Sequence, residues 1–363
     1  MFKLPASELL ISKKEGINIK YLPQRQLSAA LSVLKEQNLT PLLLIDHFQN
    51  PTFSSTPSTA LIHLNSGLHS VGEKQCELWI GSGDWQQGKT NLYADIELSF
   101  CFNQDFLIGS LSLPLSSGAS LQDLSQIYYE QIMHYISDKN QHHLLRMWNY
   151  LPFINQVDND LERYQQFCIG RHEGFAINKM IDFAYPAASA VGNYSNGDSA
   201  QLVITFIATQ HCGHFLENPN QISAYQYPDY YSPRSPSFAR ASIYQTEKLE
   251  QLYISGTASI VGHESKFSGD IINQTHQTIK NLKYLIDHSN EAGTVSEVFH
   301  LSSTDKFAPA VKVYLRNPAD LDKVQAIIQA FIPGVNNVCY LQADICRQEL
   351  DIEIEMLLNR PGA

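Results

Sequence analysis

Five stretches of the chain are predicted to be helical. In SLQDLSQIYYEQIMHYISD, residues 120–138, the apolar side chains return every three or four positions and so line one helix face. The other expected helices cover residues 27–36, 157–184, 270–288 and 318–332.

Short apolar segments bounded by turn residues predict the strands. In the first half they are CELWIGSG, LYADIELSFCF and FLIGSLSLPL. The second half opens with the apolar segment QLVITFIATQ and continues with LYISGTASIVGHES, VKVYL, VCYLQADI and ELDIEIEML. This order of strands and helices is typical of an α+β fold, in which helices cover one face of a mixed sheet.

The length of 363 residues suggests two domains. A loop of small and turn-forming residues, 184–200, separates the second predicted helix from QLVITFIATQ. We therefore expect domains 1–195 and 196–363. The segment ELWIGSGDW, residues 77–85, resembles LYISGTASI, residues 252–260, which indicates a duplicated α+β unit. Strands that end in glycine are common, so coincidence is the alternative.

Composition and charge exclude some partners. The formal net charge is −11, which argues against a nucleic-acid binder, although a pocket on an acidic protein can still be locally basic. No run of 18 apolar residues occurs and the first residues lack a signal-peptide pattern, so we expect no membrane span and a cytoplasmic location. The six cysteines are scattered without a CxxC pair, so reduced thiols are expected.

The segment ELDIEIEML places three carboxylates on one face of a strand. Side chains alternate along a strand, so Asp351, Glu353 and Glu355 point away from the apolar face. In a cleft, burial and mutual repulsion would keep one carboxyl protonated near neutral pH. A solvated acidic face is the alternative.

Four arginines lie in segments rich in aromatic residues, where guanidinium groups bind planar carboxylates in a bidentate manner. They are Arg146, Arg163, Arg171 and Arg240. Surface salt bridges are the alternative. The segment HCGH, residues 211–214, lacks a second cluster of metal ligands, and the chain has neither a P-loop nor a GxGxxG or GxSxG motif, so no metal or cofactor is expected.

Five segments in order resemble the chorismatase family. They are RMWNYLPFIN, ERYQQFCIGR, SPRSPSFARAS, YISGTASIVGHES and QADICRQELDIEIE. The resemblance implies cleavage of chorismate to pyruvate and a hydroxybenzoate, either 3-hydroxybenzoate or a mixture with 4-hydroxybenzoate, for secondary metabolism. The C-terminal half also resembles the small RidA/YjgF proteins, which implies two RidA/YjgF-like (chorismate-mutase-like) units, the second of which carries the active site.

The resemblance also assigns residues. It implies that Glu353 is the acid and that Cys346 and Ser259 occupy product-determining positions. Family members forming only 3-hydroxybenzoate tend to have glycine at the latter position, and those forming the dihydroxycyclohexadiene-carboxylate have alanine. Substrate carboxylates are expected at Arg163 and Arg240 with Tyr150 nearby, and also at Arg146 and Arg171.

Two other functions remain open. The chain could be a chorismate hydrolase forming the dihydroxycyclohexadiene-carboxylate. It could also be a RidA-like imine deaminase or a binder of small carboxylates, although RidA proteins are short single-domain chains that form trimers. If the two units replace the subunit contacts of such a trimer, a monomer is expected.

Overall fold

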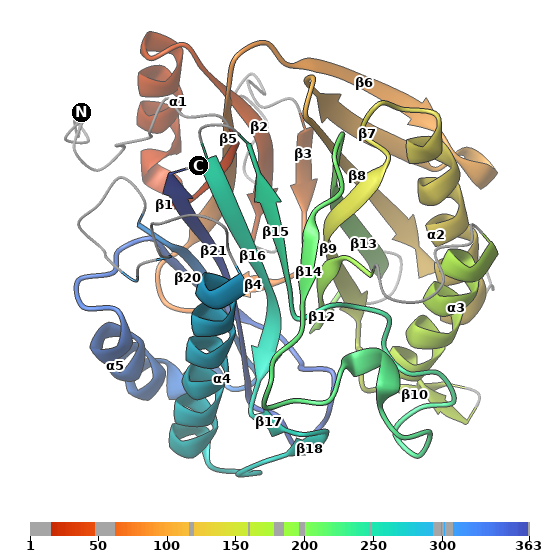
Figure 1. The fold of residues 1–363 in the computed structure, drawn as a ribbon, viewed down its shortest axis with the longest axis vertical. Helices are drawn as coiled ribbons and strands as arrows, with labels where there is room; N and C mark the ends of the chain where they lie inside the picture. Colours follow the sequence, from red (N-terminus) through yellow and green to blue (C-terminus); the bar gives the residue numbers. More distant parts are fainter. Residues whose placement is uncertain are drawn as a thin grey trace.

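A computed structural model describes residues 16–47, 62–115, 120–158, 160–177, 185–195, 200–246, 249–292, 299, 301 and 308–361 (Figure 1). The predicted helix 27–36 is confirmed as α1 (Leu27–Glu36), and 120–138 as α2 (Leu121–Ser137). The helices predicted at 270–288 and 318–332 are α4 (Ile271–Ala292) and α5 (Leu321–Phe331). Among the described residues, none of the helices has the length and apolar character needed to cross a bilayer.

One prediction misplaced a helix start. The helix expected from residue 157 begins as α3 (Arg163–Ile177), because the residues before it pair as two short antiparallel strands, β10 (Val157–Asp158) and β11 (Leu161–Glu162). Residues 178–184 of that prediction lie outside the described residues.

The first large sheet has six strands in the order β12-β9-β13-β8-β7-β6. These strands are β6 (Gln86–Asn91), β7 (Glu97–Phe102), β8 (Phe106–Pro114), β9 (His143–Pro152), β12 (Ala187–Asn193) and β13 (Gln201–Thr209). Helices α2 and α3 pack on its outer face through a buried apolar cluster.

The second large sheet has the order β14-β15-β16-β21-β19-β20-β4. Its strands are β4 (His69–Ser70), β14 (His214–Leu216), β15 (Ala241–Gln245), β16 (Leu249–Ala258), β19 (Ala310–Leu315), β20 (Val338–Gln342) and β21 (Ile352–Pro361). A hairpin of β17 (Ile260–Val261) and β18 (Glu264–Ser265) follows β16, and α4 and α5 cover the outer face.

The two large sheets have the same topology. Reading β6, β7, β8, β13, β9 and β12 across the first sheet matches β14, β15, β16, β21, β19 and β20 across the second. In both, the pair that ends the series is parallel and the pairs between the second and fifth strands are antiparallel. Each large sheet with its two helices is one copy of the fold. In each copy one helix follows the third strand of this series (α2 after β8, α4 after β16) and the other follows the fifth strand (α3 after β9, α5 after β19). The predicted α+β class with two related units of mixed sheet and helices is confirmed.

The two similar segments that suggested the duplication are not equivalent strands of the two copies. The strand equivalent to β16 is β8, whose sequence is FLIGSLSLP, whereas ELWIGSG forms β5 (Gln75–Ser82) in a different sheet. The boundary expected after residue 195 also does not coincide with the end of the first sheet. Strand β13 pairs with β8 and β9, so this sheet extends to Thr209.

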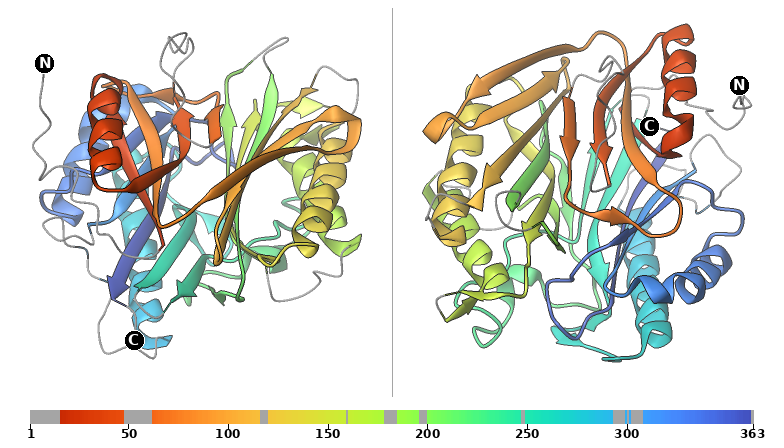
Figure 2. Two further views of the ribbon diagram at one scale, coloured as in Figure 1. Left: turned by 90° about the horizontal axis from the view of Figure 1, so that it is seen from above. Right: turned by 180° about the vertical axis from the view of Figure 1, so that it is seen from behind.

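A third sheet, formed by the N-terminal residues, stands outside both copies. It has the order β1-β5-β2-β3 and consists of β1 (Ile17–Pro23), β2 (Leu39–Asp46), β3 (Ile62–Asn65) and β5, with α1 on its outer face. Its other face joins a buried core shared with the inner faces of both large sheets. Figure 2 shows the helices of the two copies on opposite outer sides, with the sheets between them.

The two copies meet where β12 lies beside the second sheet. The backbone amide of Ala187 donates to Ser242 Oγ, and that of Ala188 donates to Ser255 Oγ, each at 2.9 Å. Gly192 and Asp344 form a β-bridge between the copies. This junction fixes α3 and β12 against β16 and β21.

Close packing of α2 on α3 depends on two glycines of α3. A Cβ at Gly170 would overlap the carbonyl oxygen of Gln122, and one at Gly174 would lie 2.7 Å from Tyr129 Cβ. Helix α2 is itself fixed at its start, because Ser120 Oγ accepts a hydrogen bond from the Asp123 amide at 3.1 Å. Only glycine allows this separation between the two helices.

We expect Gly170→Ala to destabilise the protein by about 1–3 kcal/mol, because the added methyl group must push α3 away from α2. A loss of stability would be informative, because without a clash alanine is favoured over glycine in a helix interior by about 1 kcal/mol. Urea denaturation measures the change, with Glu173→Ala on the same helix as the control. A Gly170→Ala protein at least as stable as the wild type would contradict the packing argument.

Candidate active site

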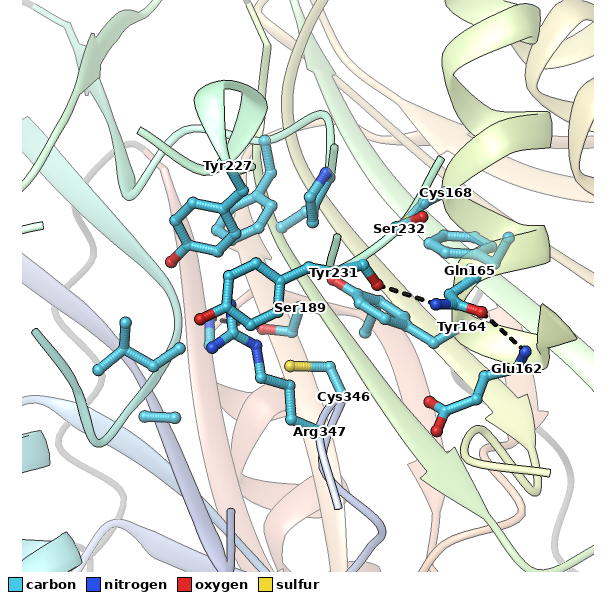
Figure 3. A pocket seen from close by; sticks show the side chains of 18 of the residues that line it. Glu162, Tyr164, Gln165, Cys168, Ser189, Tyr227, Tyr231, Ser232, Cys346 and Arg347 are labelled. Carbon is cyan, nitrogen blue, oxygen red and sulfur yellow. Dashed lines mark hydrogen bonds between the residues drawn. The ribbon is translucent and has the colours of Figure 1, made fainter. Parts of the chain in front are cut away.

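A cavity of about 390 Å³ lies at the junction of the two copies (Figure 3). The first copy contributes residues of α3 and the strand β12. The second contributes β16, the 227–240 segment, the 346–349 segment and the start of β21. Neither copy encloses this space alone.

Glu353 lies in the wall of this cavity, near the start of β21. Its neighbours Ile352 and Ile354 point into the helix-covered core, so the alternation expected for this strand is found. Glu353 pairs across the sheet with Ala258 and is only 4% exposed. A Cβ at Gly256 would overlap the Glu353 carboxyl group, so a larger residue there would displace this carboxyl group from its position.

The Glu353 carboxyl group is held in its neutral form. Its Oε1 is buried without a hydrogen-bond partner. Burial, and secondly the charge of Glu355, raise the pKa of Glu353 to about 8, against the opposing effect of Arg146 and Arg240. At neutral pH this group is therefore predominantly a carboxylic acid that faces a cavity. Asp351, expected to contribute to the shift, instead accepts a hydrogen bond from Gln274 Nε2 at 3.1 Å.

Glu355, two residues along the same strand, is in the opposite state. Burial alone would raise its pKa, but Lys312 and Arg146 lower it. Lys312 Nζ lies 2.9 Å from one carboxylate oxygen and Arg146 Nη2 lies 2.8 Å from the other. Trp148 Nε1 also donates to Glu355, at 2.8 Å. Glu355 is thus a fully paired buried anion beside a neutral acid.

Ser189 on β12 connects this anion to the cavity wall. Its hydroxyl donates to Glu355 Oε2 at 2.5 Å and accepts from the Gly256 amide at 2.9 Å. Gly256 on β16 lies against Glu353 in the cavity wall. The Ser189 hydroxyl therefore holds both this part of β16 and the Glu355 carboxylate behind the wall.

Three guanidinium groups line the cavity. Arg171 on α3 is buried among the rings of Tyr129, Phe167 and Phe175, and its Nε and Nη2 have no hydrogen-bond partner. Unpartnered buried donors are costly unless a ligand satisfies them. Arg171 is therefore well suited to bind an anion.

The other two guanidinium groups are held in place by the second copy. Arg240 Nη2 donates to Tyr227 Oη at 2.6 Å, while its Nε lacks a hydrogen-bond partner. Arg347 stacks on the ring of Tyr231, 3.9 Å from its centroid, and donates to the His263 carbonyl at 2.8 Å. Sequence reasoning missed Arg347, although it directly follows Cys346 in one of the five recognised segments.

Several predicted site residues lie outside the cavity lining. Arg163 is instead bound to Asp158 at 2.5 Å and to the Pro152 carbonyl at 2.8 Å. Arg146 pairs with Glu355 behind the wall, and the Tyr150 hydroxyl lies 3.5 Å from Lys312 Nζ. These are corrections: the direct contacts expected of Arg163, Arg146 and Tyr150 with a substrate do not fit their positions.

Ser259 is also misplaced by one residue. Its hydroxyl donates to the Lys266 carbonyl at 2.9 Å, and Ala258 lines the cavity instead. The cause is a β-bulge, because the two residues between Ile254 and Thr257 oppose the single residue between Met356 and Ile354. Simple alternation from Ile254 would point Ser259 into the cavity, whereas the extra residue of the bulge points Ala258 there instead.

Cys346 lines the cavity, and Cys168 on α3 does so too. Burial raises the pKa of each thiol to about 12, so both are neutral at physiological pH. Tyr227 and Tyr231 face the same space as Cys346 and Arg347 (Figure 3). Gln165 holds this tyrosine segment to α3 by donating to the Tyr231 carbonyl at 2.9 Å.

No group of three or more histidine, cysteine or acidic side chains is arranged to hold a metal ion in the described part of the chain. The arrangement can do two things: bind an anion through guanidinium groups and donate a proton from a buried carboxyl group.

Comparisons with known proteins find similarity to chorismatases. The family model "Chorismatase FkbO/Hyg5-like, N-terminal" matches residues 77–208. A 3-hydroxybenzoate synthase of Streptomyces hygroscopicus is 29% identical over 295 residues, which are 78% of this chain and 82% of that protein. A chorismatase of the same organism is 33% identical over 221 residues, 58% of this chain and 60% of the relative. A chorismatase crystal structure superposes with a TM-score of 0.79 at 25% identity, covering 95% of this chain and 98% of that one.

We expect Glu353→Gln to stabilise the fold at pH 7–8. A carboxyl group whose folded pKa is about 8 rather than the ordinary 4.5 binds its proton more tightly in the folded state. Its contribution is fully present below pH 4.5 and is lost as the pH rises through 8. Thermal melting of wild type and variant between pH 4.5 and 8.5 measures this, and the gap should widen with pH. A constant gap would contradict the raised pKa.

Proposed function

Because this chain belongs to the chorismatase family, we propose that it cleaves chorismate to pyruvate and 3-hydroxybenzoate. The observation that carries the proposal is the buried, neutral carboxyl group of Glu353, which faces a cavity lined by three guanidinium groups. The name of one relative, 3-hydroxybenzoate synthase, supports the choice of aromatic product.

The reaction requires a carboxylic acid rather than a carboxylate. Chorismate carries an enolpyruvyl ether, whose oxygen leaves poorly until the methylene carbon of the side chain is protonated. Protonation there produces an oxocarbenium ion and makes pyruvate a good leaving group. A carboxyl group with a pKa of about 8 holds its proton at neutral pH and can still release it, which suits Glu353 as the general acid.

The substrate is a dianion, and the cavity offers matching cations. Two substrate carboxylates need two or more guanidinium partners, and Arg171, Arg240 and Arg347 are available in the lining. The unpartnered Nε and Nη2 of Arg171 make it the best candidate for a bidentate contact. Holding both carboxylates also orients the enolpyruvyl carbon for protonation.

Formation of the aromatic product consumes no water, since chorismate contains the same atoms as hydroxybenzoate and pyruvate together. After protonation of the side chain, the adjacent ring hydroxyl attacks the carbon that pyruvate leaves and gives up its proton, which Glu353 can take back. The resulting epoxide opens, the ring loses a proton and the oxygen gains one. The neutral thiols of Cys346 and Cys168 and the nearby aromatic rings supply a wall that favours this internal route over attack by water.

One observation favours hydrolysis as a second candidate. Ala258, not Ser259, occupies the lining position opposite Glu353. In the family resemblance, alanine at this position accompanies the dihydroxycyclohexadiene-carboxylate, whereas Cys346 accompanies a hydroxybenzoate. The two products differ by one water molecule, so chromatography distinguishes them.

We also propose that the protein acts on chorismate as a monomer without a cofactor. A single chain supplies both walls of the cavity, the acid and three guanidinium groups.

The wild type should release pyruvate from chorismate, measured by coupled NADH oxidation, and chromatography should find 3-hydroxybenzoate. Glu353→Gln should lower turnover by about 10²–10⁴-fold, since general acid catalysis contributes that much. Folding of the variant is checked by its thermal melting. Near-normal turnover would remove Glu353 from the role of acid, and absence of pyruvate with the wild type would overturn the proposed function.

Replacing a cavity arginine should weaken substrate binding. Arg171→Leu should raise KM about tenfold or more, because a hydrogen-bonded charge contact contributes about 1.5–3 kcal/mol. Arg163→Gln, on the same helix but outside the cavity, should leave KM close to the wild-type value. Steady-state kinetics of pyruvate release compares them. Equal KM values for both variants would contradict the assignment of Arg171.

A further inference from the structure

A chain of buried ionic contacts runs from the N-terminal sheet to the strand that carries Glu353. Glu77 on β5 lies 2.8 Å from Lys312 Nζ, and the same ammonium group lies 2.9 Å from Glu355. Lys312 and Glu355 are cross-strand partners on β19 and β21. The side chains of Glu77 and Lys312 are at most 1% exposed, and that of Glu355 is 6% exposed.

The charges in this cluster balance. Glu77 and Glu355 are the anions, and Lys312 and Arg146 are the cations. The other titratable groups that face them are Tyr21, His47, Cys76, Tyr150, Tyr314 and Cys339. Burial raises the pKa of the phenols and the thiols and lowers that of the imidazole, so all six are neutral at physiological pH. The Asp46 carboxyl group, which acts on His47 and Cys76, is bound to His63 at 2.7 Å.

Glu77 and Glu355 are held by two tryptophans that pack against each other. Trp79 Nε1, two residues along β5, donates to Glu77 at 2.6 Å. The Trp79 ring packs edge-on against Trp148, with centroids 4.8 Å apart, and Trp148 in turn donates to Glu355. Two tryptophans from different sheets thus hold the two carboxylates that share Lys312.

We propose that Lys312, itself held by Glu77, is a positioning residue for the acid Glu353 and acts through Glu355 as a fixed buried anion. The inference rests on the proposed function. It also gives the N-terminal sheet a role in the chemistry, although this sheet lies outside both copies and contributes no residue to the cavity lining described above.

The expected effect of Lys312 on the protonation of Glu353 follows from the number of charges that are buried together. Without Lys312, Glu77 and Glu355 each lose the cation that does most to lower their pKa, and Glu355 retains only Arg146, so uptake of a proton by Glu355 becomes more favourable. If Glu355 becomes neutral, Glu353 loses the neighbouring anion that favours its protonated form. The charged groups that then act on Glu353 are Arg146 and Arg240, which favour ionisation. The remaining close titratable groups, Cys346 and Tyr164, are neutral because burial raises the pKa of each.

The test compares variants that remove one or both of these charges, and it measures how their activity depends on pH. In the wild type, kcat/KM for pyruvate release should fall as the pH rises through about 8, where Glu353 loses its proton. Lys312→Met should move this alkaline limb down by about one pH unit or more, as expected for the loss of a close like charge. The double variant Glu77→Gln/Lys312→Met restores the balance and should return the limb towards the wild-type position. Glu77→Gln alone leaves Lys312 and Arg146 on Glu355, so it should move the limb less than Lys312→Met does.

A second readout does not depend on activity. The infrared carbonyl stretch of a protonated carboxyl group, taken as the difference between each protein and its Glu353→Gln counterpart, reports the titration of Glu353 directly. Its midpoint should fall in Lys312→Met and recover in the double variant. A merely structural role for Lys312 would reduce stability or kcat without moving this midpoint.

The outcomes separate the two claims. Absence of pyruvate with the wild type overturns the proposed function, whereas an unchanged carboxyl titration in Lys312→Met overturns this inference. If Lys312→Met does not fold, Glu355→Gln replaces it: the midpoint should fall further in Glu355→Gln than in Glu77→Gln. Equal midpoints in those two variants would also overturn the inference.

Discussion

The buried anion Glu355 is the constraint on which the candidate site depends. A carboxyl group that must donate a proton at neutral pH needs a low-dielectric setting and a neighbouring negative charge that cannot itself be neutralised. Lys312, Arg146, Trp148 and Ser189 hold that charge on Glu355. Glu353, two residues away on the same face of β21, has no such partner on Oε1 and is left neutral.

This division of roles explains why the chain contains two copies of one fold. The second copy supplies both carboxylates on β21, but the groups that fix Glu355 come largely from the first copy, through β9 and β12. The strand of the first copy that is equivalent to β21 is β13, with the sequence QLVITFIAT, which has no ionisable side chain. The second copy thus supplies the acid, and the first supplies the groups behind Glu355 together with Arg171 in the cavity lining.

The sequence predicted the helices, the α+β class and the face of β21 because these depend on local periodicity. It also supplied Glu353, Cys346, Arg171 and Arg240, which the structure brings to one cavity. It failed where tertiary structure decides. The β-bulge after Ile254 exchanges Ser259 for Ala258, and no local pattern reveals that the guanidinium of Arg163 is engaged by Asp158. The register of the duplication was missed because ELWIGSG resembles β16 by composition and not by place in the fold.

Glu77 shows most clearly what sequence reasoning cannot reach. It lies in an apolar strand, CELWIGS, where a single acidic residue gives no periodic signal. Its partner Lys312 is likewise the one charged residue of AVKVYL. A lone charge in a buried strand is expensive unless an opposite charge meets it, so two such strands must find each other in the folded state. Each isolated charge therefore argues for a partner elsewhere in the chain, but only the three-dimensional arrangement identifies that partner and connects the pair to Glu355.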